Sequence, residues 1–134
     1  MNEVSIRKAV RTGWVLLAVS LPLGVTLEAL HGFKVRGFLE SEVRREMWRL
    51  AHAHGTLLGI LLLVFAAVCE HHVAESARAP ISRDLRFGAV LMPLGFFAGG
   101  ILCSEGDPSL GILLVPLGAV FLLIALVRAA FAAK

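Results

Sequence analysis

The sequence has 134 residues, of which 57% are hydrophobic, and its mean hydropathy is +0.81. This composition excludes a soluble domain, because a chain this short would have to cover its core with polar surface. The charged residues, 17% of the total, gather in four clusters, and the net charge of +3 requires no nucleic-acid partner. The sequence therefore predicts an all-α integral membrane protein that crosses the bilayer several times.

Four apolar stretches separate the charged clusters. A helix needs about 20 residues to cross a hydrocarbon core of about 30 Å, and each stretch reaches or approaches that length. The stretches cover residues 12–30, 47–69, 87–103 and 109–130. A polar connection, residues 31–46, separates the first two. We expect a four-transmembrane-helix bundle that forms one membrane domain over residues 1–134, with the lipid bilayer as its main partner.

The lysines and arginines divide unequally between the two sides of such a bundle. The side with both termini has Arg7, Lys8, Arg11, Arg78, Arg83, Arg86, Arg128 and Lys134. The opposite side has Lys34, Arg36, Arg44, Arg45 and Arg49. The positive-inside rule then predicts a bacterial-type inner-membrane protein with both termini in the cytoplasm.

Two pairs of segments are similar to each other. Residues 57–68 (LLGILLLVFAAV) match residues 109–120 (SLGILLVPLGAV) at seven of twelve positions, and residues 18–25 align with residues 89–96 through a shared Pro-Leu-Gly. The pairs occur in the same order along the chain. This internal repeat predicts two tandem, related helical hairpins, of which the first carries a longer connection.

The polar connection becomes helical in pattern from about Phe38. The simplest prediction is a long amphipathic extension that Ser41 helps to start and that enters the bilayer near Met47. Trp48 and Arg49 would then be interfacial anchors. A separate amphipathic helix on the membrane surface, hinged before the span, is the open alternative.

Two histidines, His52 and His54, mark the start of the second apolar stretch. They lie about 200° apart around a helix, so they cannot bind one small ligand together. His52 shares its face with Gly55 and Gly59, a GxxxG pattern typical of close helix packing, and is expected to face protein. His54 shares a Leu-rich face and is expected near lipid, headgroups or another subunit.

Two other predicted helices carry stripes of small or polar residues at helical spacing. The stripe on the first helix contains Ser20, Gly24, Glu28 and His31. The stripe on the third contains Gly95, Gly99 and Cys103. Both stripes end at the membrane boundary where His52 lies, so we expect Glu28, His31, His52 and Cys103 to converge there. The packing residues would be Gly24, Gly55, Gly59, Gly95 and Gly99.

Glu28 carries the functional hypothesis, because it is the only acidic residue well flanked by apolar sequence. Carboxylates within a membrane are costly and usually functional. With His31, His52, Cys103 and, less centrally, His54, it forms a predicted polar site near the non-cytoplasmic boundary that binds a transition metal or haem, or handles protons. These donor types do not select one metal.

Three other functions are also compatible with the sequence. The chain could be a structural or assembly subunit, either as a homo-oligomer or within a larger membrane complex, or a small oligomeric channel or transporter. The segment Glu42–His54, where Arg/Glu-rich sequence runs into the second helix, also resembles the small four-span membrane enzymes of eicosanoid and glutathione metabolism. That resemblance implies a glutathione-transferase-like enzyme, although the family's fuller Arg/Asn/Glu pattern is missing.

Overall fold

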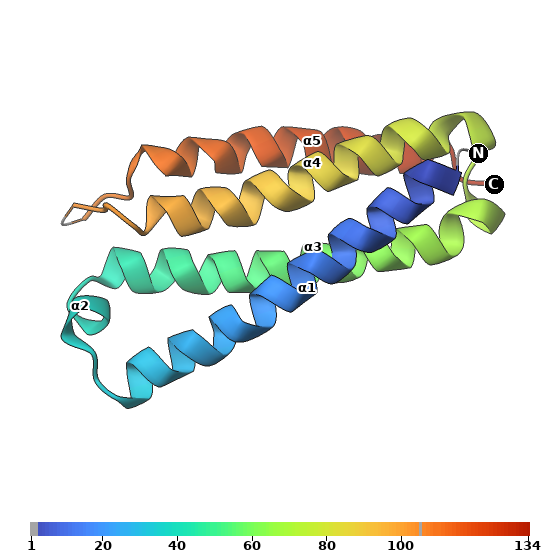
Figure 1. Cartoon of the computed structure of the whole chain (residues 1–134). Helices are drawn as coiled ribbons and strands as arrows, with labels where there is room; N and C mark the ends of the chain where they lie inside the picture. The colour runs from blue at the N-terminus through green and yellow to red at the C-terminus, as the bar shows by residue number, and fades with distance from the viewer. Residues whose placement is uncertain (1–2, 105) are drawn as a thin grey trace.

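Four long helices run side by side along the molecule (Figure 1). The computed structural model describes residues 3–104 and 106–134, of which 85% are helical. The elements are α1 (Glu3–Gly32), α2 (Arg36–Leu39), α3 (Glu42–His72), α4 (Glu75–Gly99), the 3₁₀ helix η1 (Leu110–Leu113) and α5 (Leu114–Phe131). Both termini and the α3–α4 turn lie at one end, called the terminal end. The α1–α3 and α4–η1 connections lie at the other, called the loop end.

The prediction of four membrane-length apolar helices is correct for three segments. Glu3–Gly32, Glu42–His72 and Leu110–Phe131 are long and apolar enough to cross a membrane. Of the segment predicted as a span over residues 87–103, residues 87–99 belong to α4, which begins at Glu75 and ends at Gly99, and the rest belongs to the following connection. The first half of α4 carries four charged side chains after Glu75, and these lower its apolar content: Arg78, Arg83, Asp84 and Arg86.

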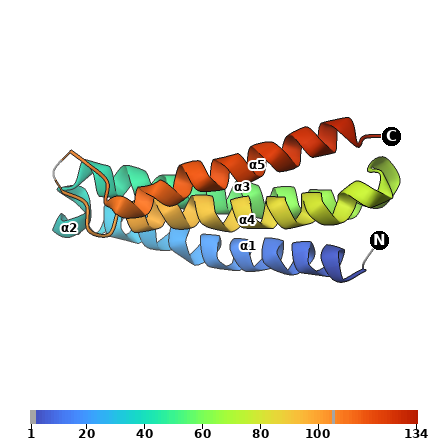
Figure 2. The ribbon, with the colours of Figure 1, turned by 90° about the horizontal axis from the view of Figure 1, so that it is seen from above.

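Helix α4 lies at the centre of the bundle. It packs against α1, α3 and α5, and Figure 2 shows it between α5 and α1. Its buried side chains include Ile81, Leu85 and Ala89, which join one core with Leu62 and Phe65 of α3. Its neighbours shield the polar side chains on its buried faces, Ser82 at 1% and Asp84 at 2% exposed, and such shielding makes polar residues tolerable within a membrane bundle.

The outward faces of the other long helices are apolar. Exposed large side chains include Leu21 and Val25 on α1, Leu57 and Val64 on α3, and Leu123 on α5. A soluble monomer rarely exposes so much contiguous apolar surface. The described surface is therefore compatible with a surrounding bilayer.

The polar connection leads into α3, which forms one continuous helix with the second apolar stretch. Ser41 is its N-cap, with extended backbone, and its Oγ accepts a hydrogen bond from the Arg44 backbone N–H at 3.2 Å. From Glu42 the helix continues without a break to His72. The prediction of one long second helix started by Ser41 is confirmed. The four residues Arg36–Leu39 form α2, a separate short turn of helix.

Glycines lie where the helices approach most closely. Gly55 faces Ser20 of α1, and a Cβ atom added at Gly55 would be 2.4 Å from the Ser20 Oγ. The other predicted packing glycines also face neighbouring elements: Gly24 against His52, Gly59 against Gly13, Gly95 against Val115 and Gly99 against Ile112. The two similar segments make different contacts, since Gly59 faces α1 near its start and Gly111 faces Ala98 near the end of α4. The hairpin duplication stays a prediction of the sequence.

Candidate functional site

His52 faces α1, as its helical face predicts. Its Nδ1 lies 2.8 Å from the Ser20 carbonyl oxygen. Its ring covers Gly24, where an added Cβ would lie 2.5 Å from the ring carbon Cε1. His52 therefore reaches the polar stripe of the first helix at Ser20 and Gly24.

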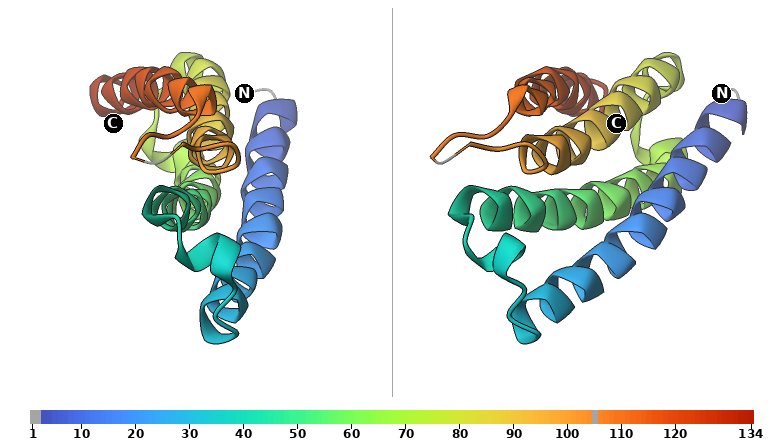
Figure 3. Two further views of the ribbon diagram at one scale, coloured as in Figure 1. Left: turned by 90° about the vertical axis from the view of Figure 1, so that its left-hand side faces the viewer. Right: turned by 60° about the vertical axis from the view of Figure 1, so that its left-hand side comes forward.

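Glu28 and His31, the next members of that stripe, are both exposed. Helix α1 crosses α3 and then diverges from it toward the loop end (Figures 1 and 3). This divergence carries Glu28 and His31 away from α3. In the part of the chain that the structure describes, neither side chain makes a hydrogen bond or ion pair.

Cys103 also lies apart from His52. Helix α4 ends at Gly99, so Cys103 belongs to the following connection and not to a helical stripe. Its Sγ lies 3.5 Å from the Ser41 Oγ and 3.6 Å from the Gly100 carbonyl oxygen. Among the described residues, no group of three or more His, Cys, Asp or Glu side chains is arranged to hold a metal ion. The expected convergence of Glu28, His31, His52 and Cys103 is not found.

His54 packs within the bundle, which corrects its expected place near lipid or another subunit. Its ring lies against Phe96 of α4, with 4.8 Å between the ring centroids. Its Nδ1 lies 2.8 Å from the Leu50 carbonyl oxygen, one turn back on α3. The face that reads as Leu-rich in the sequence is therefore the face that meets α4.

Trp48 and Arg44 hold the C-terminal end of α4. The Trp48 ring stacks between Phe38 and Phe97, and its Nε1 donates a hydrogen bond to the Phe97 carbonyl oxygen at 3.1 Å. The Arg44 guanidinium lies over the Trp48 ring and donates through Nε to the Gly100 carbonyl oxygen at 3.0 Å. The last carbonyls of a helix lack partners within it, and these two side chains supply them.

Two further contacts complete this arrangement. Ser109 donates from its Oγ to the Ala98 carbonyl oxygen at 2.7 Å and from its backbone N–H to that of Gly99 at 2.9 Å. Trp48 is thus a structural contact between α3 and α4, and its role as an interfacial anchor stays a prediction. Arg49 is exposed, and the anchor prediction stays untested for it.

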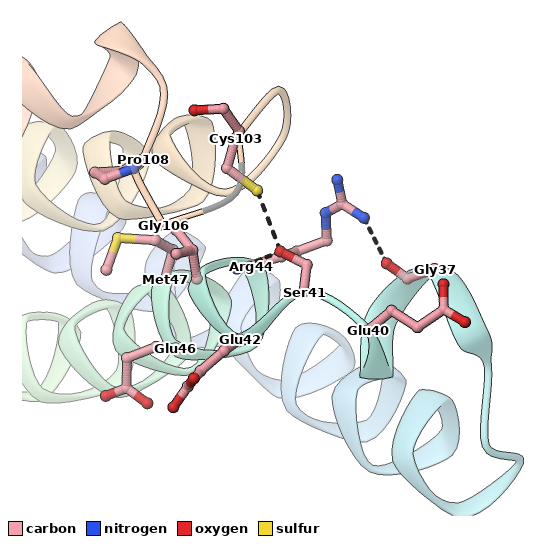
Figure 4. Close-up of a pocket in the computed structure, with 12 residues that line it drawn as sticks. Gly37, Glu40, Ser41, Glu42, Arg44, Glu46, Met47, Cys103, Gly106 and Pro108 are labelled. Atoms are coloured by element: carbon pink, nitrogen blue, oxygen red, sulfur yellow. Dashed lines mark hydrogen bonds between the residues drawn. The ribbon is translucent and has the colours of Figure 1, made fainter.

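An open groove of about 880 Å³ lies beside this arrangement at the loop end (Figure 4). It runs between the start of α3 and the α4–η1 connection, and the Ser41–Cys103 contact joins its two walls. Three glutamates are among the residues that line it: Glu40, Glu42 and Glu46. Figure 4 shows Glu42 and Glu46, one helical turn apart, extending to the same side of α3. Within residues 3–104 and 106–134, none of the three forms an ion pair.

A second polar centre lies toward the terminal end. Asp84 is only 2% exposed. Its Oδ1 accepts from Arg83 Nε at 2.8 Å, and its Oδ2 accepts from Arg128 Nη1 of α5 at 2.5 Å. On the opposite side of α4, Ser82 donates from its Oγ to the Ser5 carbonyl oxygen of α1 at 3.0 Å. Charged and polar groups therefore connect α4 to both of these neighbours.

The sequence analysis did not single out Asp84, because this residue lies in the charged cluster between the second and third predicted spans. A signal was present: Asp84 lies in helical register with Ile81, Leu85 and Gly88, which all prove to be buried. A carboxylate on such a face predicts a buried ion pair, and Arg128 near the end of the last apolar stretch is its natural partner.

No protein-family model matches the chain, and comparisons with curated proteins and with solved structures found no similar chain.

Proposed function

We propose that this chain is a small integral protein of a bacterial-type inner membrane that binds a positively charged partner at its loop end. In this proposal α1, α3, α4 and η1–α5 all cross the bilayer, and both termini lie in the cytoplasm. The loop-end groove then opens on the non-cytoplasmic side. The chain is a binding or assembly subunit, and no catalytic step is assigned to it.

The apolar outer surface supports the membrane placement. The three membrane-length helices pack around α4 and bury Ser82 and Asp84 in its first half, whereas Arg83 remains exposed. The excess of Lys and Arg at the terminal end supports the orientation. The groove also lies where α3 extends furthest beyond the apolar part of its sequence.

The single observation that carries the binding role is the unequal pairing of charges at the groove. Arg44 is engaged with the Gly37, Gly100 and Ile101 carbonyl oxygens, and Arg45 donates to the Leu39 carbonyl oxygen. Among the residues that the structure describes, the carboxylates of Glu40, Glu42 and Glu46 have no such partners. Like charges one turn apart repel each other, so a cationic ligand between or beside them relieves that repulsion.

The same contacts count against the glutathione-transferase-like alternative. A glutathione site needs cationic donors free to bind the carboxylates of an anionic tripeptide. Arg44, which lines the groove, already donates to three backbone carbonyl oxygens. The metal role lacks a group of three or more His, Cys, Asp or Glu side chains placed to hold an ion among the described residues.

The native thiol of Cys103 tests the proposed charge of the groove. The Cys69→Ser variant leaves Cys103 as the single cysteine, since the chain has two. The purified variant is treated with a cationic and an anionic methanethiosulfonate of similar size at low ionic strength. After correction for their rates with a free thiol, we expect the cationic reagent to react about tenfold faster.

Two variants with glutamine in place of glutamate identify which carboxylates make Cys103 react faster with the cationic reagent. The triple change Glu40→Gln, Glu42→Gln and Glu46→Gln should abolish this preference, whereas the matched change Glu28→Gln on α1 should leave it intact. Spermidine should slow the cationic reagent in the parent and not in the triple variant. Equal rates for the two reagents in the parent protein would refute the cationic ligand.

The orientation is tested on the same single-cysteine protein in intact cells. A membrane-impermeant maleimide should label Cys103 from outside without permeabilisation. Labelling only after the membrane is opened would place the groove in the cytoplasm and reverse the proposed topology.

A further inference from the structure

Asp84 holds two arginine side chains from different helices next to each other. Arg83 uses Nε and Arg128 uses Nη1 for this carboxylate. A guanidinium carries several N–H donors, so each arginine keeps donors that Asp84 does not use. One negative charge also cannot neutralise two positive charges. The result is a fixed pair of guanidinium groups with an uncompensated positive charge.

Both arginines remain accessible although Asp84 is buried. Their side chains are 56% (Arg83) and 45% (Arg128) exposed. The described residues contain no other carboxylate within ion-pair distance of either one. The pair is therefore available to an anion that approaches from outside the bundle.

An apolar surface begins one helical turn deeper on the same two helices. Phe87 follows Arg83 by four residues, and Ile124 precedes Arg128 by four, so each lies on the same helix face as its arginine. Phe87 is 51% exposed and packs against Phe121 of α5, with 5.5 Å between the ring centroids. Charged donors thus stand directly beside exposed aromatic and aliphatic side chains.

We propose that Arg83 and Arg128 form a binding site for the phosphate of an anionic phospholipid, with Phe87 and Ile124 against its acyl chains. The proposal rests on the membrane placement proposed above. Guanidinium groups bind phosphate oxygens through charge-assisted, often bidentate hydrogen bonds. Asp84 acts as the positioning residue that fixes the two arginines in one place. A free phosphate offers the same oxygens but gains nothing from the apolar surface.

Lipid binding can be measured on the full chain in a neutral detergent. Native mass spectrometry counts bound lipid while phosphatidylglycerol or phosphatidylcholine is added at matched concentrations. We expect the parent protein to bind phosphatidylglycerol more tightly. The Arg83→Gln change should weaken that binding about fivefold, because one basic residue near a lipid surface contributes about 1 kcal/mol. Arg83→Gln leaves Arg128 paired with Asp84, so the helices keep their contact.

Arg11→Gln is the matched control, because it removes the same charge from an exposed position at the same end of the bundle. It should change phosphatidylglycerol binding less than twofold. An equal loss in Arg11→Gln and Arg83→Gln would overturn the site, because attraction would then follow net charge alone. Phe87→Ala should weaken long-chain phosphatidylglycerol and leave binding of water-soluble glycerol phosphate unchanged.

Two further measurements complete the test. One distinguishes a lipid from a free anion, and the other tests the membrane placement independently of the binding site. If inorganic phosphate displaced phosphatidylglycerol at equal concentration, the lipid assignment would be wrong. Membrane placement is read separately, from whether alkaline carbonate leaves the protein in the membrane pellet. A protein that stays in the pellet but shows no preference for phosphatidylglycerol refutes only the lipid site.

Discussion

Gly13 and Gly59 meet backbone to backbone where α1 crosses α3. A Cβ added at Gly13 would lie 2.9 Å from the Gly59 carbonyl oxygen, and one added at Gly59 would lie 3.1 Å from that of Gly13. Gly88 and Gly118 make the corresponding contact between α4 and α5, at 2.8 Å from Cβ to carbonyl oxygen. Each helical hairpin is therefore held at a crossing where a side chain does not fit.

Gly13→Ala should destabilise the bundle. The new methyl group meets a backbone oxygen that cannot rotate away, so α1 must shift, and we expect a net loss of about 1–2 kcal/mol after the gain in helix propensity. Thermal unfolding in detergent measures this loss. Gly32→Ala is the control, because an added Cβ there has no atom within 4 Å. Equal melting temperatures for the two variants would contradict the crossing.

Trp48→Phe should weaken the attachment of α4 to α3. Phenylalanine keeps an aromatic ring between Phe38 and Phe97 but removes the Nε1 donor to the Phe97 carbonyl oxygen. Loss of that hydrogen bond should cost about 1 kcal/mol. Trp14→Phe provides the comparison, since Trp14 is 60% exposed and should cost less than about 0.5 kcal/mol. Chemical denaturation followed by circular dichroism distinguishes the two tryptophans.

Asp84→Asn should loosen the contact between α4 and α5. The amide cannot balance the positive charge of Arg83 and Arg128. Removal of one partner from a buried ion pair costs about 3–5 kcal/mol, and the exposure of the two arginines reduces this to about 1–3 kcal/mol. Asp107→Asn, at an exposed position in the α4–η1 connection, should leave the melting temperature unchanged. An unchanged melting temperature for Asp84→Asn would show that helix packing alone holds α4 and α5 together.

His52→Ala should lower stability without changing any cofactor signal. We expect the purified protein to show no Soret band and no stoichiometric metal, because the predicted donors do not meet in the structure. The variant loses the contact from Nδ1 to the Ser20 carbonyl oxygen, which should cost about 1 kcal/mol. His71→Ala, at an exposed position, is the control. A Soret band that disappears in His52→Ala would restore the haem hypothesis, with the second axial ligand supplied by another chain.

Local sequence signals predicted the parts of the fold that depend on neighbouring residues. The start of α3 at Ser41 follows from capping chemistry, and the orientation of His52 follows from the small residues Gly55 and Gly59 on its helix face. These features need only the geometry of a single helix.

The candidate site depends on relations between helices, which helical spacing within one segment does not give. Helical spacing places Glu28 on the same stripe as Ser20 and Gly24, but it does not show that α1 leaves α3 beyond the contact with His52. Cys103 continues the spacing of Gly95 and Gly99, yet the helix has already ended when the chain reaches it. Asp84 was not predicted because its partner Arg128 lies on α5, 44 residues further along the chain.

The length of α3 affects how far the groove lies from the membrane surface. Its 31 residues correspond to about 46 Å of helix, whereas the hydrocarbon core is only about 30 Å thick. In the proposed membrane placement, the helix must therefore tilt, or a total of about 16 Å, roughly ten residues, must extend beyond the lipid at its charged start and its polar end at His71 and His72. In a thicker bilayer a shorter part of α3 would extend beyond the lipid, and the carboxylates at its start would lie closer to the headgroups. The distance of the groove from the membrane surface therefore depends on the thickness of the bilayer as well as on the protein.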